Sequence, residues 1–370
     1  MPHVTPLKLE ELVSDGIWTL PRYDADVTPC PIDLSDNTNL WGAPPGVLQE
    51  LREVPASTLA RYPSLYSAPL HASALRYLGI ESTPELGLLT GCGSDDVIDT
   101  VMRAFGRPGD KVAFSSPTFG MIPIFAELNC LTPVAVPLTA QFDIDAMRLV
   151  DVGAKITYVC APNNPTGTAV SRSALEYILS RARGIVLLDE AYAEFAPETF
   201  IDLLMNFERL IVARTFSKAF GLAGLRVGLG IGHVRVCALL ERVRGPYRVT
   251  SVAERAVLAA LAPVTDGLTW VREHAALAVH NRNRFSEELR AMGFDPLPSV
   301  ANFVLVPASN AQAIARTLIA AGIRVRAFVG LPLEIPCFHE SGGAALRIGV
   351  GPWPMMQAVL DNITRPAACA

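Results

Sequence analysis

Short apolar runs alternate with helical segments between about residues 85 and 232, and this alternation most constrains the fold. The six runs are rich in valine, isoleucine and leucine: KVAFSSP, PVAVPL, ITYVCAP, GIVLLDE, RLIVART and LRVGLGI. Runs of this kind are typical of strands buried on both faces, as in a parallel sheet. Between them, GSDDVIDTVMRAF and SRSALEYILSRA repeat apolar residues at helical spacing, the second after a serine cap at Ser171. The pattern predicts a doubly wound α/β domain.

The pattern changes after about residue 250. A long helical stretch leads to the strand SVANFVLVP, and the helix AQAIARTLIAAG and the strands IRVRAF and ALRIGVG follow. These elements indicate a smaller α+β unit, and a chain of 370 residues is long enough for two domains. We therefore expect a large domain over residues 46–250 and a small C-terminal domain over 251–370. Residues 1–45 are rich in proline, and we expect them to form an arm that packs on the small domain or on a partner subunit.

Charge and composition exclude several classes of protein. The net charge is −5 and basic runs are absent, which argues against a nucleic-acid partner. The seven cysteines lack C-x-x-C spacing and the six histidines lack ligand spacing, so we expect no disulfide framework and no metal. Charged residues near the start argue against a signal peptide, and proline interrupts the uncharged stretches that could span a membrane. We expect a soluble, reduced, cytoplasmic protein.

Polar residues follow three of the predicted strands, at the edge where open α/β sheets bind ligands. ITYVCAP leads to NNPTG, GIVLLDE leads to Asp189 and Tyr192, and RLIVART leads to Lys218. The helix that opens at GCGSDD offers unpaired N–H groups and the positive end of its dipole, which suit an anion. The alternatives are a turn for NNPTG, a structural ion pair or cap for Asp189, and a solvated side chain for Lys218.

Together these groups suit an anionic, aromatic cofactor. Asp189 would pair with a protonated ring nitrogen, and Lys218 would form a Schiff base with an aldehyde, which requires a neutral amine and a lowered pKa. The groups expected around a phosphate are Gly93, Ser94, Asp95, Thr215, Ser217 and Arg226. Pyridoxal phosphate, whose ring acts as an electron sink, makes all of these demands. The acidic pair Asp95 and Asp96 favours helix capping over metal binding.

The order of the motifs extends this hypothesis. They are RYP (61–63), GCGSDD (91–96), SPTFGM (116–121), APNNPTG (161–167), DEAY (189–192), TFSKAFGLAGLRVG (215–228) and LRIGVG (346–351). Over almost its whole length the chain resembles the fold-type I pyridoxal-phosphate enzymes, and most of all their histidinol-phosphate aminotransferase branch. The resemblance implies the aspartate aminotransferase-like fold, with a mostly parallel doubly wound sheet and a smaller α+β C-terminal domain.

The resemblance also implies roles for single residues. Lys218 resembles the lysine that holds the cofactor and then moves the substrate α-proton, and Asp189 resembles the partner of the pyridinium. Asn164 and Tyr192 resemble the pair that hydrogen-bonds the phenolic oxygen of the cofactor and holds down the Schiff-base pKa. Phe119 stands where the family stacks an aromatic ring on the pyridine, although it could also be a core residue.

Further residues are implied to bind substrate or to join two subunits. Tyr62 resembles the tyrosine that reaches the cofactor phosphate of the neighbouring subunit, which implies a homodimer with shared active sites. Arg347 resembles the arginine that binds the substrate α-carboxylate, and Arg326 the arginine that binds a substrate phosphate. Asn39, in DNTNLWGAPP, is expected to bind substrate as well.

Two departures from the branch leave the substrate open. The segment AFVGLPLEIPCFHESGGAA, between Arg326 and Arg347, is longer than usual, and Arg248 stands where asparagine is common. The first hypothesis is an aminotransferase that converts L-histidinol phosphate and 2-oxoglutarate to imidazole acetol phosphate and L-glutamate. The alternatives are an aromatic or other amino-acid aminotransferase and a decarboxylase of an amino-acid phosphate. A regulatory effector domain is disfavoured because we see neither room for a DNA-binding domain before residue 45 nor a basic charge.

Overall fold

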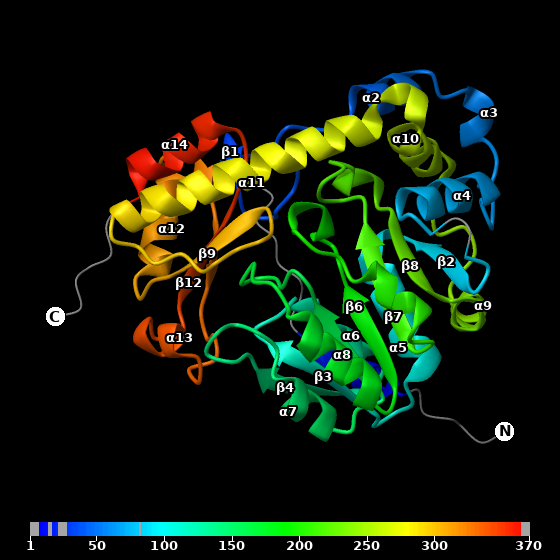
Figure 1. Ribbon diagram of the computed structural model, residues 1–370, viewed down its shortest axis with the longest axis horizontal. Coiled ribbons are helices and arrows are strands. Elements are labelled where there is room, and N and C mark those ends of the chain that lie inside the picture. The colour runs from blue at the N-terminus through cyan, green and yellow to red at the C-terminus, as the bar shows by residue number, and fades with distance from the viewer. Residues whose placement is uncertain (1–6, 14–16, 21–27, 81–82, 364–370) are drawn as a thin grey trace.

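A computed structural model describes residues 7–13, 17–20, 28–80 and 83–363, and a seven-stranded sheet lies at its centre (Figure 1). In spatial order the strands are β2 (Leu86–Gly91), β8 (Gly228–His233), β7 (Leu210–Thr215), β6 (Ile185–Asp189), β5 (Ile156–Cys160), β3 (Lys111–Ser116) and β4 (Thr132–Pro137). Neighbours from β7 to β4 are parallel, whereas β8 is antiparallel to β7 and β2. The mostly parallel α/β sheet is therefore confirmed, with one correction: LRVGLGI forms an antiparallel strand. β2 was not among the predicted runs.

Helices cover both faces of this sheet. Alternation along β6 sends Ile185 and Leu187 to one face and Val186 and Leu188 to the other. The first face packs against α5 (Gly93–Phe105), α6 (Met121–Leu128) and α9 (Val234–Val243). The larger core on the other side includes α2 (Pro45–Arg52), α4 (Ala68–Tyr77), α7 (Ala146–Asp151), α8 (Arg172–Arg181) and α10 (Ser251–Leu261). Because both faces are buried, the strands of this sheet are apolar almost throughout.

A second sheet lies at the other side of the molecule (Figure 1). Its antiparallel order is β11 (Arg326–Phe328), β12 (Ala345–Gly349) and β9 (Phe303–Pro307), with α12 (Ala311–Ala320) and α14 (Trp353–Asn362) packed in the same core. The long helix α11 (Gly267–Ala291) joins the two sides, since its Val271 and Ala275 belong to the core of the large sheet and its Phe285 and Leu289 to that of the small one.

The run IRVRAF is not one strand, contrary to our prediction. Ile323–Arg324 forms β10, which pairs in parallel with β1 (Ile32–Asp33), whereas Arg326–Phe328 forms β11 in the three-stranded sheet. The chain changes partner at Val325, and this change brings residues 32–34 against the small core, where Leu34 is buried. Parts of the 1–45 arm lie outside the described residues, and the division at residues 45 and 250 stays a prediction.

The segment between β11 and β12 is folded rather than open. It contains α13 (Pro336–Glu340), and Ile335 and Phe338 are fully buried in the core of the large sheet. The remaining short elements are α1 (Leu9–Leu12), α3 (Ala56–Leu59) and the 3-10 turns Ile17–Thr19, Ala193–Phe195, Ile201–Met205, Ala223–Leu225 and Pro263–Thr265. None of the helices in the described part of the chain is both long and apolar enough to cross a membrane.

Candidate active site

The carboxyl ends of β5, β6 and β7 meet at one edge of the large sheet, and the predicted polar residues follow them there. Lys218 lies in the turn after β7. Its Nζ donates a hydrogen bond to the carbonyl oxygen of Asp36 at 2.9 Å and lies 5.8 Å from the centre of the Tyr192 ring. Removal from water, followed by the charge of Arg347, lowers the pKa of this amine to about 8. The lowered pKa makes the neutral form of Lys218, which a nucleophilic amine needs, easier to reach near neutral pH.

Asp189 ends β6 and is 4% exposed. Burial raises the pKa of its carboxyl group to about 6, while hydrogen bonds from the Tyr158 hydroxyl to Oδ2 (2.8 Å) and from the Ala191 N–H to Oδ1 (3.0 Å) oppose that rise. Tyr158 comes from the neighbouring strand β5 and is fully buried. A buried carboxylate held in this way suits a cationic ring nitrogen as its partner.

The start of α5 and the turn after β7 form a compact polar cradle. Arg226 Nη1 donates to Ser217 Oγ at 3.3 Å, and its Nη2 lies 3.4 Å from Asp95 Oδ2. A Cβ atom on Gly93, whose φ is 79°, would lie 2.5 Å from Arg226 Nη2. The left-handed φ favours glycine where the arginine approaches the helix start, and backbone N–H groups beside a guanidinium suit a phosphate.

The neighbouring polar residues at the helix start have structural roles as well. Asp96 Oδ2 accepts from the Cys92 N–H at 2.9 Å, which agrees with the capping expected for the acidic pair. Thr215 Oγ1 accepts from the Ser217 N–H at 3.1 Å and so stabilises the turn that carries Lys218. Arg248, which departs from the family pattern, lies 3.4 Å from Asp96 Oδ1.

Arg347 connects the small sheet to this edge of the large one. Its Nη1 donates to Asn164 Oδ1 at 2.6 Å, and its Nη2 donates to the carbonyl oxygen of Ser35. The guanidinium carbon lies 5.5 Å from the centre of the Phe303 ring and 5.6 Å from that of Phe328. Two aromatic rings thus flank the guanidinium and hold it in a defined plane.

Arg326 is the residue directly opposite Arg347 in the antiparallel pair of β11 and β12. Directly opposed residues of antiparallel strands project from the same face, so both arginines lie on one side of the small sheet. Arg326 is exposed, whereas Arg347 is 9% exposed. Two arginines at directly opposed positions on one face of a sheet suit a doubly charged anion.

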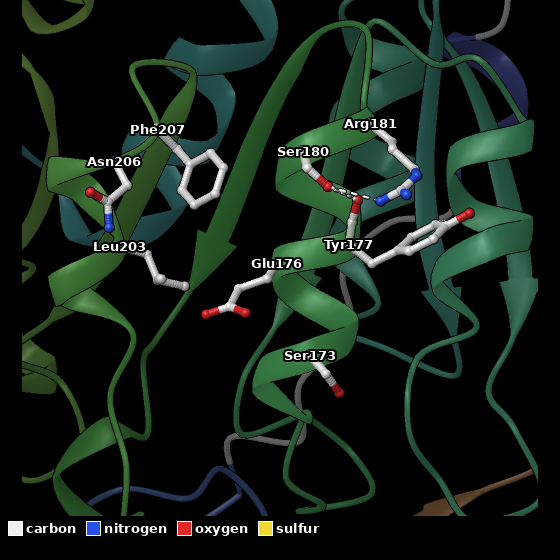
Figure 2. Close-up of a pocket in the computed structure, with 8 residues that line it drawn as sticks. All are labelled: Ser173, Glu176, Tyr177, Ser180, Arg181, Leu203, Asn206 and Phe207. Atoms are coloured by element: carbon white, nitrogen blue, oxygen red, sulfur yellow. Dashed lines mark hydrogen bonds between the residues drawn. The ribbon is translucent and has the colours of Figure 1, made fainter.

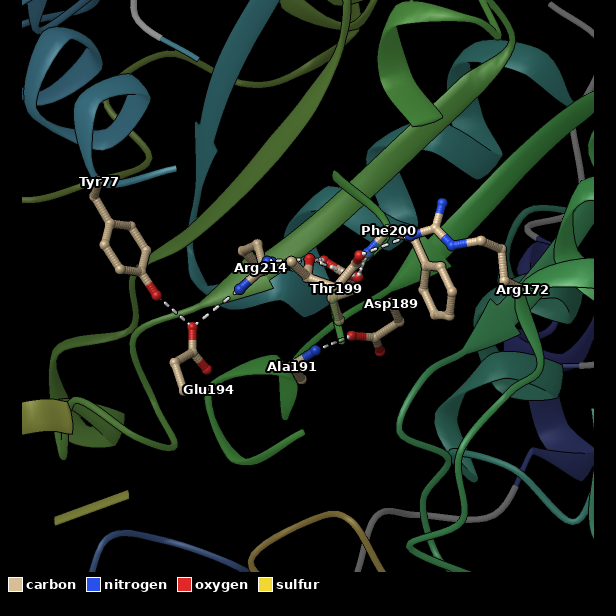
Figure 3. A network of polar contacts seen from close by, with 9 residues as sticks. Tyr77, Arg172, Asp189, Ala191, Glu194, Thr199, Phe200 and Arg214 are labelled. Carbon is tan, nitrogen blue, oxygen red and sulfur yellow. Dashed lines mark hydrogen bonds and ion pairs between the residues drawn. The ribbon is translucent and has the colours of Figure 1, made fainter. Parts of the chain in front are cut away.

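A buried ion-pair network supports the DEAY segment (Figure 3). Arg214 Nε lies 2.9 Å from Glu190 Oε2, and its Nη1 lies 3.1 Å from Glu194 Oε1, which also accepts from the Tyr77 hydroxyl. Glu190 is 1% exposed and follows Asp189 directly. Because a broken buried pair leaves an uncompensated charge, this network fixes the backbone that carries Asp189 and Tyr192.

Three further predicted residues, Asn39, Phe119 and Tyr62, have different surroundings. Asn39 Nδ2 donates to the carbonyl oxygen of Ala219, the residue after Lys218, at 2.8 Å. Phe119 is half-buried beside the core that contains α5 and α6. Tyr62 is 82% exposed and stacks on Tyr247, with ring centres 4.8 Å apart.

Two residues of the site were missing from our sequence predictions. The Asn37 Nδ2 donates to the Tyr192 hydroxyl at 3.1 Å, and Tyr158 donates to Asp189 as described above. Strand alternation could have identified Tyr158, since it occupies β5 two residues before Cys160, the residue paired with Asp189. Asn37 gave no such signal, because its contact spans 155 residues of sequence.

A hollow elsewhere on the molecule shares no residue with this site (Figure 2). It lies between α8 and the turn near residue 205, and its lining residues are Ser173, Glu176, Tyr177, Ser180, Arg181, Leu203, Asn206 and Phe207. Among the residues that the structure describes, no three histidine, cysteine or acidic side chains gather as metal ligands would.

Comparison with known proteins decides the family. Residues 30–363 match the family model for aminotransferase class I and II. The chain belongs to this family. Among its relatives, the histidinol-phosphate aminotransferase of Roseiflexus castenholzii is 40% identical over 91% of this chain and 90% of its own length, and that of Thermoanaerobacter pseudethanolicus is 32% identical over 86% and 91%.

The fold of this aminotransferase agrees with solved structures. The histidinol-phosphate aminotransferase from Sinorhizobium meliloti, solved in complex with pyridoxal-5'-phosphate, superimposes with a TM-score of 0.79 and 25% identity over 90% of this chain and 89% of that one. The expected aspartate aminotransferase-like fold and aminotransferase class are confirmed.

Proposed function

We propose that this chain is a pyridoxal-phosphate-dependent histidinol-phosphate aminotransferase, which passes the amino group of L-histidinol phosphate to 2-oxoglutarate. The observation that carries the reaction class is the convergence of three groups at one sheet edge: the amine of Lys218, the buried carboxylate of Asp189 and the guanidinium of Arg347. The substrate is supported by the curated relatives, which share this name at up to 40% identity.

The residues present fit pyridoxal phosphate. The cradle of Gly93, Ser94, Ser217 and Arg226 would hold the phosphate, and Asp189 would hold the ring nitrogen in its protonated form. When bound, the cofactor supplies an aldehyde that bonds to amines and a ring that takes up an electron pair. Lys218, with a pKa of about 8, is suited to take a proton from the substrate α-carbon and return it, because its neutral form is accessible near neutral pH.

The two arginines of the small sheet support a phosphorylated donor. Histidinol phosphate carries a phosphate ester where amino acids carry a carboxylate, and a phosphate dianion can engage Arg347 and Arg326 together. A carboxylate needs only the bidentate contact of Arg347. The relatives give no support to decarboxylation. Three of the most similar ones compared are each named as histidinol-phosphate aminotransferases.

A comparison of amino donors tests this proposal. The visible band of the purified holoenzyme is followed while L-histidinol phosphate, L-phenylalanine, L-glutamate or threonine phosphate is added. We expect histidinol phosphate to bleach the band at low concentration, glutamate to bleach it at higher concentration, and 2-oxoglutarate to restore it. If phenylalanine bleaches it more efficiently, the enzyme is an aromatic aminotransferase, and the substrate proposal fails.

Substitution of Arg326 sharpens the test. We expect Arg326→Ala to reduce kcat/KM for histidinol phosphate by about 10-fold to 100-fold and to affect glutamate much less, because one charge-assisted contact to the phosphate is lost. Arg316→Ala, which removes an exposed arginine from α12, is the matched control and should leave both values unchanged. Equal losses for both donors would contradict a phosphate-specific role for Arg326.

We further propose a homodimer in the cytoplasm. Tyr62 and the stacked Tyr247 form an exposed aromatic pair on the surface, a position suited to reach a neighbouring subunit. The six cysteines within the described residues are thiols, which supports a reducing compartment.

A further inference from the structure

Residues 35–39 contact the polar groups around Lys218 at four points. The carbonyl oxygens of Ser35 and Asp36 accept from Arg347 and Lys218, respectively, and the Asn39 amide donates to Ala219. The fourth contact is between two side chains: Asn37 Nδ2 donates to the Tyr192 hydroxyl at 3.1 Å, in a buried position. The Asn37 side chain therefore contacts a group that we expect to touch the cofactor.

The backbone and its surroundings hold Asn37 in place. The residue is 2% exposed, and its φ of 58° lies in the left-handed region that asparagine, aspartate and glycine tolerate best. The carbonyl oxygen of Asn37 accepts from Asn302 Nδ2 at 3.0 Å, and Leu34, three residues earlier, is buried in the core of the small sheet. The backbone of Asn37 is thus held in one position, from which the side-chain amide reaches Tyr192.

The direction of this hydrogen bond determines what Tyr192 can do. A hydroxyl that accepts from an amide N–H points its own hydrogen elsewhere, and accepting such a bond makes the hydroxyl a stronger donor. Burial raises the pKa of Tyr192, so the hydroxyl keeps its hydrogen at neutral pH. Within the described residues, Asn37 is the side chain that donates to this oxygen.

We propose that Asn37 is a positioning residue, which orients the Tyr192 hydroxyl so that it donates to the phenolic oxygen of pyridoxal phosphate. This inference rests on the proposed function, because that oxygen belongs to the cofactor. A donor at the phenolic oxygen withdraws negative charge from it and so lowers the pKa of the nitrogen that joins the cofactor to Lys218. Asn37 thereby helps to keep that nitrogen ready to react at neutral pH.

Two substitutions test the proposal. Asn37→Gly removes the amide and tolerates the left-handed backbone. Asn37→Asp also tolerates it, and its carboxylate accepts from the tyrosine hydroxyl and cannot donate to it. Each is made in the wild-type chain and in a Tyr192→Phe chain. The measurements are the pH midpoint of the visible band of the lysine-bound cofactor, the cofactor Kd, and the melting temperature of the cofactor-free protein.

We expect each Asn37 variant to raise the pH midpoint by about half a unit or more and to weaken cofactor binding several-fold. In the Tyr192→Phe background, Asn37→Gly should cause no further change in the midpoint, because the hydroxyl through which Asn37 acts is gone. The charged groups that face Lys218 and Tyr192 are Arg347, Arg226, Asp36, Asp95 and Asp189. They are the same in the wild-type and glycine variants, so they cancel in that comparison, whereas Asn37→Asp adds one negative charge in both backgrounds.

Equal midpoint shifts in the two backgrounds would overturn the proposal, since Asn37 would then act on the fold and not through Tyr192. An unchanged midpoint in the wild-type background would overturn it as well. If the glycine variant does not fold, the aspartate variant should shift the midpoint more in the wild-type background than in the Tyr192→Phe background, because the part of its shift that comes from its added charge is common to both, and equal shifts would overturn the proposal. A wild-type protein that shows no visible band with added cofactor would instead refute the proposed function.

Discussion

Lys218 and Asp189 owe their altered pKa values to the same physical cause. Burial disfavours the charged form of each group, so the pKa of the lysine falls to about 8 and that of the aspartate rises to about 6. The pKa of the lysine thus falls toward 7 and that of the aspartate rises toward 7. A cofactor with a cationic ring would stabilise the charged aspartate and so return its pKa toward the ordinary range.

The raised pKa of Asp189 predicts a pH dependence of stability in the cofactor-free protein. A folded pKa above the unfolded value stabilises the fold at low pH, and this stabilisation is lost as the pH rises from about 4 to above 6. Relative to Asp189→Asn, the wild-type chain should lose about 3 kcal/mol over that interval. Urea denaturation of both proteins at several pH values measures the difference, and parallel pH profiles would contradict the prediction.

At the residue scale, the sequence patterns predict where those candidate residues lie that stand at or just after strand ends. Asp189 and Thr215 end β6 and β7 and Lys218 lies just after β7, and the end of a parallel strand determines where these side chains lie. Asn37 could not be predicted in this way. Its position depends on β1 pairing with β10, a contact between distant parts of the chain that no local pattern encodes.

At the scale of elements, the segment between β11 and β12 is the main departure from the family pattern. Its Phe338 is fully buried and contacts Phe142 edge to face, with ring centres 6.3 Å apart, and Gly343 N–H donates to the Phe338 carbonyl at 2.6 Å. The segment is thus a packed part of the core, and it leads directly into β12, which carries Arg347.

This packing predicts the effect of substitutions in the segment. Phe338→Ala should lower the free energy of unfolding by about 3 kcal/mol or more, because it leaves a cavity in the core. Leu333→Ala, at a residue that is 53% exposed, is the control and should change it by less than about 0.5 kcal/mol. Chemical denaturation measures both. Similar small effects for the two variants would show that the segment is not part of the core.

The elements also show the limit of pattern reading. Long apolar runs such as GIVLLDE predict strands, whereas the pattern does not predict LGLLTG in β2 and predicts IRVRAF as one strand. The glycines of β2 weaken the sequence pattern that predicts a strand. The segment forms a strand nonetheless, because it pairs with β8. The division of IRVRAF between two sheets depends on which partner strands are available.

At the scale of the whole molecule, α11 joins the cores of the two sheets. The candidate site contains residues from the large sheet and from the small sheet. Arg347 belongs to the small sheet, and Lys218 and Asn164 to the large one. The predicted homodimer adds a third contribution, since Tyr62 would complete the site of the other subunit.

A shared site predicts complementation between inactive subunits. Lys218→Ala and Tyr62→Ala chains are each expected to have low activity as homodimers. After both are unfolded and refolded together, about a quarter of the sites should combine an intact Lys218 with an intact Tyr62, and activity should rise accordingly. Activity no greater than the sum of the separate variants, measured in a preparation shown to be dimeric, would exclude Tyr62 from the neighbouring site.

The most direct test of the account follows the nitrogen atom itself. The holoenzyme is incubated with L-histidinol phosphate labelled with ¹⁵N at its amino group and with 2-oxoglutarate, and the products are analysed by mass spectrometry. We predict ¹⁵N-labelled L-glutamate in equal amount to imidazole acetol phosphate. Absence of ¹⁵N-labelled L-glutamate and no consumption of histidinol phosphate, while another amino donor is turned over, would contradict the proposed reaction.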